Sequence, residues 1–168
     1  MTRDTTGSIH TLRWDRRGGR PAVSVTVAAE PSRAWRVLRD TTQWPAWGPS
    51  VSDVETSDRY VGPGTVGRVQ TPVGWLRFRV TSCADRRWAW RIGGLPGTGH
   101  SVRTVADTTV VQIDVPAVAI GYLPVCARGL RRLAVLVDRP SEAAGQPEND
   151  GAEDCDEGRQ SGRKDASE

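Results

Sequence analysis

Residues 23–55 read VSVTVAAEPSRAWRVLRDTTQWPAWGPSVSDVE and hold a strand pattern and a helix pattern in direct succession. Residues 22–29 alternate valine with small or polar side chains, which is the period of a strand with one buried face. Pro31 follows, and proline is typical of the first turn of a helix. The stretch therefore predicts a strand that leads straight into a helix.

Two tryptophans come directly after this predicted helix, in the segment TTQWPAWGPSV. Pro45 and Pro49 each lack an N–H group and restrict the residue before them, which predicts a loop-like segment. Trp44 and Trp47 are large apolar side chains for such a segment. We expect them either to plug a core or to wall a cavity.

The rest of the chain predicts an α+β fold with an antiparallel sheet. Six further strands are expected at residues 51–56, 65–71, 76–84, 88–92, 100–105 and 108–115, with turn signals between them. Residues 117–137 predict one long helix, which Pro124 should kink. Connections of hairpin length make the seven-stranded sheet antiparallel. The glycine-rich residues 93–99 read as a flexible loop near the mouth of a cavity.

Composition divides the chain into a folded body and two flanking segments. Residues 1–20 are polar and rich in Arg and Gly, which predicts a flexible basic leader. Residues 138–168 contain no aromatic or large aliphatic side chain and carry a net charge of −6, which predicts a disordered acidic tail. The folded domain is expected at residues 21–137.

Several classes of function are disfavoured by what the sequence lacks. It has no helix-turn-helix, zinc-finger or RNP-like pattern, so no nucleic acid is expected as a partner. The best apolar run, PAVAIGYLPVCA, is too short to span a bilayer. His10 and His100 lie far apart, no CxxC occurs and no phosphate-binding glycine motif is present, so neither a metal nor a cofactor is expected.

The cysteines bear on the compartment. Cys83, Cys126 and Cys155 are odd in number and widely spaced, and no signal peptide precedes them. This favours a cytoplasmic protein with free thiols. We expect a monomer or a weak homodimer.

Four stretches together resemble the START/Bet v 1-like (SRPBCC) superfamily, in its polyketide cyclase/dehydrase-like branch. They are the opening stretch, GPGTVGRVQTPVG, WAWRIGGLPGTGH and the proline-kinked YLPVCARGLRRLAVLV. The resemblance covers residues 21–137 and implies a helix-grip fold, in which a curved sheet wraps a long C-terminal helix. Similar proteins include aromatic polyketide cyclases and lipid and quinone carriers, and the segment after their first helix forms part of the cavity rim. By position, we predict that Trp44 plugs the structure and that Trp47 contacts the rim.

Strand alternation predicts which side chains face this cavity. The side chains predicted to face away from the cavity are Arg77, Arg79, Arg91, Arg103 and Asp114. Ser82 and Thr104 share the inward parity. The candidate ligand-binding residues are Trp44, Trp47, Phe78, Trp88, Trp90, His100, Val102, Val111, Ile113, Tyr122 and Cys126.

His100 and Tyr122 are the candidate catalytic residues if the protein is an enzyme, because no inward carboxylate is predicted. His100 is either an acid/base group at the cavity wall or a strand-start histidine bonded to the preceding glycine-rich turn. Tyr122 either caps the cavity with its hydroxyl or packs the helix on the sheet.

Three functions stay open at this level. The first is binding of a small apolar or aromatic molecule, such as a lipid or a polyketide, between sheet and helix. The second is a polyketide cyclase, aromatase or dehydrase. The third is a protein-interaction module that uses the acidic tail and the basic body.

Overall fold

The computed structural model describes residues 10–139 of the 168-residue chain. Residues 1–9 of the expected leader and 140–168 of the expected tail lie outside the described residues. The elements follow the chain in the order β1 (Leu12–Arg17), β2 (Arg20–Val27), α1 (Pro31–Arg39), η1 (Thr41–Gln43), α2 (Trp44–Trp47), β3 (Asp53–Thr56), β4 (Val66–Thr71), β5 (Gly74–Ala84), β6 (Arg87–Ile92), β7 (Leu95–Val105), β8 (Thr108–Asp114), η2 (Ala117–Tyr122) and α3 (Leu123–Asp138).

All strands form one antiparallel sheet in the order β1-β2-β8-β7-β6-β5-β4-β3. The predicted α+β architecture with a long C-terminal helix is confirmed. The predicted number of seven strands is wrong, because the sheet has eight. The additional strand, β1, falls within the segment expected to be a flexible leader. In its sequence LRWDRR, apolar residues alternate with charged ones only at Leu12 and Trp14, which is too short a pattern to predict a strand, and its backbone pairs with β2 at the edge of the sheet.

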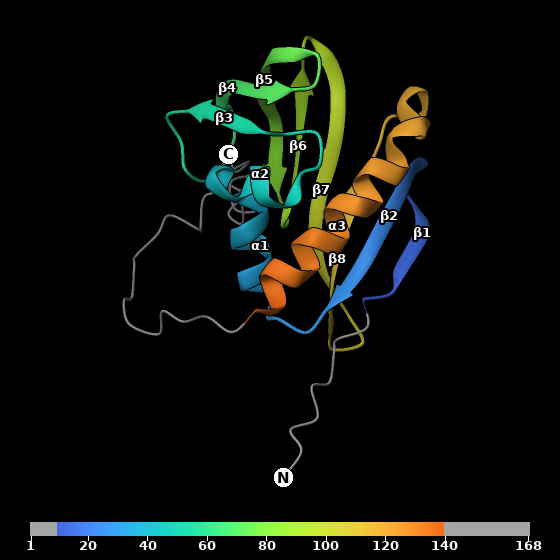
Figure 1. Cartoon of the computed structure of the whole chain (residues 1–168). Helices are drawn as coiled ribbons and strands as arrows, with labels where there is room; N and C mark the ends of the chain where they lie inside the picture. The colour runs from blue at the N-terminus through green and yellow to red at the C-terminus, as the bar shows by residue number, and fades with distance from the viewer. Residues whose placement is uncertain (1–9, 140–168) are drawn as a thin grey trace, which may run out of the picture.

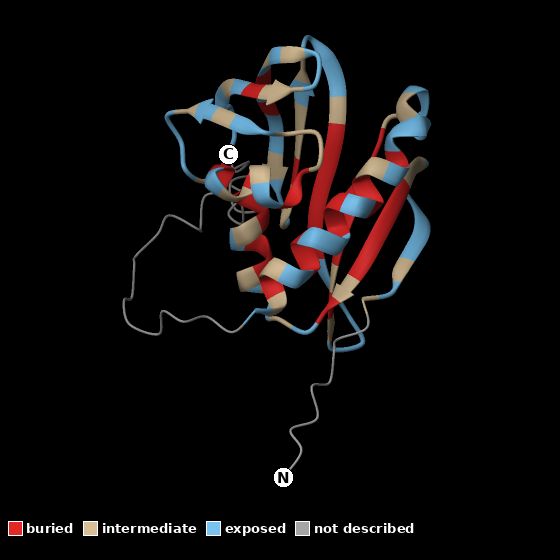
Figure 2. Cartoon of the chain, viewed as in Figure 1, coloured by how far each residue is buried: buried red, intermediate tan, exposed pale blue. Residues whose placement is uncertain are grey.

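The sheet curves around α3, which lies across β2 and β8 (Figure 1). Helices α1 and α2 pack beside α3. Strands β3 to β5 form the other end of the sheet and curve away from α3 (Figure 1). Buried residues gather where β2, β7 and α3 face one another, and β3 to β5 are mostly exposed or half-buried (Figure 2). A single helix therefore covers only part of the concave face.

The segment expected to be loop-like is a short helical turn, α2. The N–H group of Gly48 donates to the carbonyl of Trp44 at 2.7 Å, which closes the turn. Pro45 lies in the first turn, where a helix needs no N–H donor, so the proline is compatible with it. The turn fixes both tryptophans in place.

Strand β7 begins five residues earlier than predicted, so most of the expected loop at residues 93–99 is strand. Only Gly93 and Gly94, both with positive φ, form the turn before it. Gly97 and Gly99 lie within the strand, where the absence of a side chain lets neighbouring groups pack close to the backbone. A Cβ atom at Gly97 would lie 2.5 Å from the Trp90 ring, and one at Gly99 would lie 2.2 Å from the Arg87 guanidinium.

Asp114 takes the outward parity, as predicted, yet it is fully buried. Its carboxylate lies 2.5 Å from Nε of Arg20 and 2.9 Å from the guanidinium of Arg87. Gly99 leaves the space in which this ion cluster sits. A buried carboxylate needs such partners, because removing it from water without them is costly.

Cys126 is a free, buried thiol, but Cys83 is disulfide-bonded. The prediction of free thiols is therefore wrong for Cys83, and the cysteines no longer argue for a reducing compartment. Among the described residues no helix has the length and apolar character needed to span a membrane.

Asp114→Asn should destabilise the fold by about 2–3 kcal/mol, because it leaves two arginines beside a neutral amide. Urea denaturation measures the change. The control is Glu55→Gln, which breaks the exposed pair of Glu55 with Arg68 and should change the stability far less, because solvent screens this pair. Equal losses in the two variants would contradict the structural role of Asp114.

Candidate functional site

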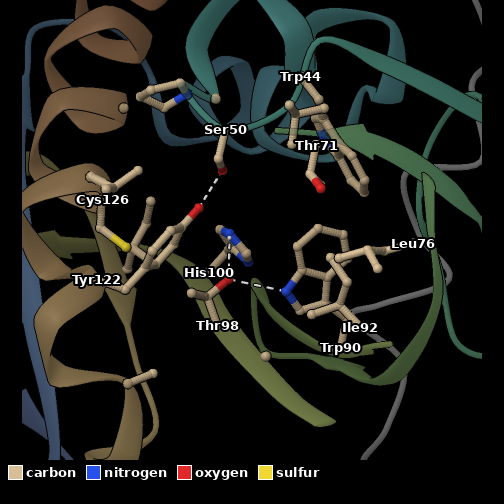
Figure 3. Close-up of a pocket in the computed structure, with 18 of the residues that line it drawn as sticks. Trp44, Ser50, Thr71, Leu76, Trp90, Ile92, Thr98, His100, Tyr122 and Cys126 are labelled. Atoms are coloured by element: carbon tan, nitrogen blue, oxygen red, sulfur yellow. Dashed lines mark hydrogen bonds between the residues drawn. The ribbon is translucent and has the colours of Figure 1, made fainter. Parts of the chain in front are cut away.

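A cavity of about 850 Å³ lies between the sheet and α3 and opens partly to solvent (Figure 3). Its walls come from α2 and the loop that follows, from β4 to β8 with the turn between β4 and β5, from η2, and from the N-terminal half of α3. Most lining side chains are apolar or aromatic. This volume lies within the range of small-molecule sites.

Three aromatic rings form a column beneath the cavity. Trp44 stacks on Trp88 with ring centroids 5.4 Å apart and planes 10° from parallel. Trp88 in turn stacks on His100 at 3.9 Å and 19°. Trp90 meets the column edge-on, 5.3 Å from Trp44. Such offset and edge-to-face arrangements are the favoured geometries of aromatic pairs.

Trp44 is the plug of the structure, in agreement with its predicted role. It is 2% exposed, and its Nε1–H donates to the carbonyl of Leu38 at 3.2 Å, which ties the indole to the end of α1. Trp47 differs from its prediction. It lines the cavity, but it is 6% exposed and lies against His100, so it belongs to the inner wall instead of the rim.

His100 belongs to a short polar chain inside this aromatic wall. Trp90 Nε1–H donates to Thr98 Oγ1 at 3.0 Å, and Thr98 Oγ1 lies 3.2 Å from His100 Nε2 (Figure 3). The arrangement that uses the Thr98 proton is donation to Nε2, which places the imidazole proton on Nδ1. His100 lies in the middle of β7, so the expectation that it starts a strand is wrong, but it does contact a residue of the preceding glycine-rich stretch, Thr98.

Burial and, to a smaller extent, the nearby Arg87 guanidinium lower the pKa of His100 from 6.5 to about 3. The imidazole is therefore neutral at neutral pH. Burial also raises the pKa of the Cys126 thiol to about 12, so this sulfur is a poor nucleophile.

Tyr122 lies at the cavity mouth, and its hydroxyl is hydrogen-bonded to Ser50 across the gap between η2 and the loop after α2 (Figure 3). Burial raises the pKa of Tyr122, although the bond to Ser50 opposes the rise. The phenol is therefore protonated and links the two sides of the mouth.

The structure brings most of the predicted residues together. The predicted residues that line the cavity are Trp44, Trp47, Trp88, Trp90, His100, Ile113, Tyr122 and Cys126. Phe78, Val102 and Val111 do not line it, because they lie in the packed core. Strand alternation placed these three side chains on the correct face of the sheet. Alternation cannot, however, distinguish a residue that lines the cavity from one in the core beneath it.

Two further expectations fail at the sheet. Ser82 is exposed, because a register shift between Val80 and Ser82 reverses the alternation of β5. Thr104 is exposed as well, near the end of β7. The four arginines predicted to face outward are exposed, namely Arg77, Arg79, Arg91 and Arg103.

Ser50, Thr98 and Arg128 also line the cavity and were missed from the sequence. Thr98 precedes His100 by two residues and shares its strand face, so a correct start for β7 would have revealed it. No sequence signal marks Ser50 or Arg128, since each becomes part of the site only through the packing of α3 against the loop after α2.

Residues 20–134 match the family described as polyketide cyclase / dehydrase and lipid transport. The chain belongs to this family. The resemblance to START/Bet v 1-like proteins is thereby confirmed, and the fold is the helix-grip fold. A search of curated protein sequences finds no significant match.

Solved structures with the same fold include an aromatase/cyclase, Zhui, from a Streptomyces species, at 18% identity and a TM-score of 0.55, covering 80% of this chain and 99% of that one. A hypothetical protein from Helicobacter pylori has 14% identity and a TM-score of 0.56, covering 78% and 98%. Ara h 8.0201 has 11% identity and a TM-score of 0.51, covering 76% and 98%. Similarity at these identities shows the fold alone.

The buried, neutral His100 should make the fold lose stability in acid. Between about pH 6.5 and about pH 3 the unfolded chain binds a proton at this imidazole and the folded chain does not, so stability falls as the pH falls through that window. The slope contributed by this residue is at most about 1.4 kcal/mol per pH unit.

NMR titration of the histidine ring signals, supported by urea denaturation at each pH, tests this. The His100 signal should stay constant from about pH 7.5 to about pH 4.5 in the folded protein and should titrate normally in the urea-unfolded chain. A folded-state titration near pH 6.5 would contradict the assignment.

Proposed function

We propose that the protein binds a small apolar or aromatic molecule, such as a lipid or a polyketide, in the cavity between the sheet and α3. The observation that carries the proposal is the cavity of about 850 Å³ walled by Trp44, Trp47, Trp88 and Trp90. The family description, which includes lipid transport, supports the same class of ligand.

The energetics of the walls favour a bound molecule. Apolar surface left against water costs roughly 25 cal/mol per Å². The tryptophan side chains in the wall are already packed on one another, so they cannot collapse to fill the space without losing those contacts. A ligand that covers the wall removes this cost without rearranging the core.

Binding is testable with N-phenylnaphthylamine, a neutral apolar fluorophore that accepts energy from tryptophan. The wild-type protein should bind it with quenching of the indole emission. Val125→Trp fills the cavity from α3 and should weaken binding by at least about tenfold, which is about 1.4 kcal/mol. The control is Val135→Trp on the exposed face of the same helix, which should bind normally.

Loss of binding in both variants, or in neither, would contradict a site between sheet and helix. Native mass spectrometry of the protein from its own host complements this test, because it identifies any molecule that occupies the cavity in the cell.

A cyclase, aromatase or dehydrase is the second candidate function. His100 and Tyr122 both line the cavity, and the family description includes polyketide cyclases and dehydrases. However, Nε2 of His100 is engaged with Thr98, and none of the described residues that line the cavity carries a carboxylate to act as a stronger base. These contacts favour binding over catalysis.

His100→Ala separates the two functions. An enzyme would lose turnover of a polyketide-like substrate by a larger factor than its affinity for that substrate, which also falls to some extent because His100 packs on Trp88. A binding protein would show no turnover before or after the substitution.

A protein-interaction module is the third candidate. It would need the tryptophans as a filled core, whereas the space beside them is open. The acidic tail on which this reading also depends lies outside the described residues.

A further inference from the structure

Among the described residues that line the cavity, Arg128 is the only one with an ionised side chain. No Asp, Glu or Lys contributes to the wall, and His100 is neutral. The guanidinium of Arg128 makes no ion pair or side-chain hydrogen bond with any part of the chain that the structure describes. The cavity therefore carries one uncompensated positive charge.

Arg128 stands at the mouth of the cavity, because it lines the wall and is also exposed to solvent. Its neighbour Gly129 is where α3 meets the loop after α2, since a Cβ atom there would lie 3.2 Å from Pro49 and 3.3 Å from the Trp47 carbonyl. The charge thus lies beside the gap that Ser50 and Tyr122 bridge.

The hydroxyl pair at the mouth adds a second donor. Ser50 and Tyr122 together hold two hydroxyl protons, and their mutual hydrogen bond uses one of them. Burial keeps the Tyr122 phenol protonated. One O–H group therefore remains to donate to a ligand.

The buried part of the cavity wall also offers hydrogen-bond donors that have no partner. Nε1 of Trp47, Nε1 of Trp88 and Nδ1 of His100 are buried without a hydrogen-bond partner. The two indoles carry only donors, and His100 carries its proton on Nδ1 when Thr98 donates to Nε2. Buried groups without partners are uncommon in folded proteins and call for an explanation such as a ligand.

We infer that the ligand carries an acidic group on its apolar or aromatic body, and that Arg128 pairs with this anion at the cavity mouth. The inference rests on the proposed function and adds a chemical class to it. A guanidinium suits a carboxylate or a similar planar or tetrahedral anion, because it donates two parallel hydrogen bonds. The apolar body then lies against the tryptophan wall.

Two fluorophores with the same aromatic body test this inference. Anilinonaphthalene sulfonate carries one negative charge, and N-phenylnaphthylamine carries none. The wild-type protein should bind the sulfonate about fivefold more tightly than the neutral compound, as expected for one partly solvated ion pair. The preference should shrink in about 0.5 M salt, where exposed charges are screened.

Substitutions at two arginines of α3 supply the matched comparison. Arg128→Gln should abolish the preference for the sulfonate, measured as the ratio of the two dissociation constants in the same variant, and Arg128→Lys should retain most of the preference. Arg131→Gln removes the same charge one helical turn away, outside the cavity, and should keep the preference intact.

The outcomes separate the inference from the proposed function. Equal binding of the two fluorophores by the wild type, or equal effects of Arg128→Gln and Arg131→Gln, would overturn the role of Arg128 and leave the cavity as a binding site. Binding of neither fluorophore would overturn both the inference and the proposed function.

Discussion

The stack of Trp44, Trp88 and His100 is the contact on which the rest of the structure depends. It joins α2, β6 and β7, and the hydrogen bond from Trp44 to Leu38 extends it to the end of α1. Because these rings pack face to face, they stay in place beneath an unfilled space instead of collapsing into it. The same column keeps His100 buried and therefore neutral.

A second constraint acts on the outer side of the sheet. Asp114 is buried against Arg20 and Arg87, and Gly99 has no side chain in the space that this cluster occupies. Arg87 and His100 thus lie on opposite faces of neighbouring strands, and the positive charge of Arg87 adds to the effect of burial on the imidazole. The polar cluster and the aromatic wall are parts of one arrangement, since β6 and β7 supply residues to both.

The chemistry of the cavity follows from these two features. Its walls are mostly apolar, its unpaired indole nitrogens are hydrogen-bond donors, and the one charged side chain among its described lining residues is positive. Such a surface complements an apolar molecule with an acceptor or acidic group. Nε2 of the cavity histidine, His100, is already engaged with Thr98.

Hydrophobic period and turn signals determined the antiparallel sheet, the long C-terminal helix and the tryptophans of the wall, because each depends on local residue order. Tertiary structure decided the rest. Strand β1 depends on backbone pairing, and the Trp90 ring lies where a side chain at Gly97 would be. Whether an inward residue such as Phe78 meets the core or the cavity, and whether Arg128 joins the site, depends on where α3 crosses the sheet. That crossing is set by contacts between residues far apart in the chain, which local sequence patterns do not record.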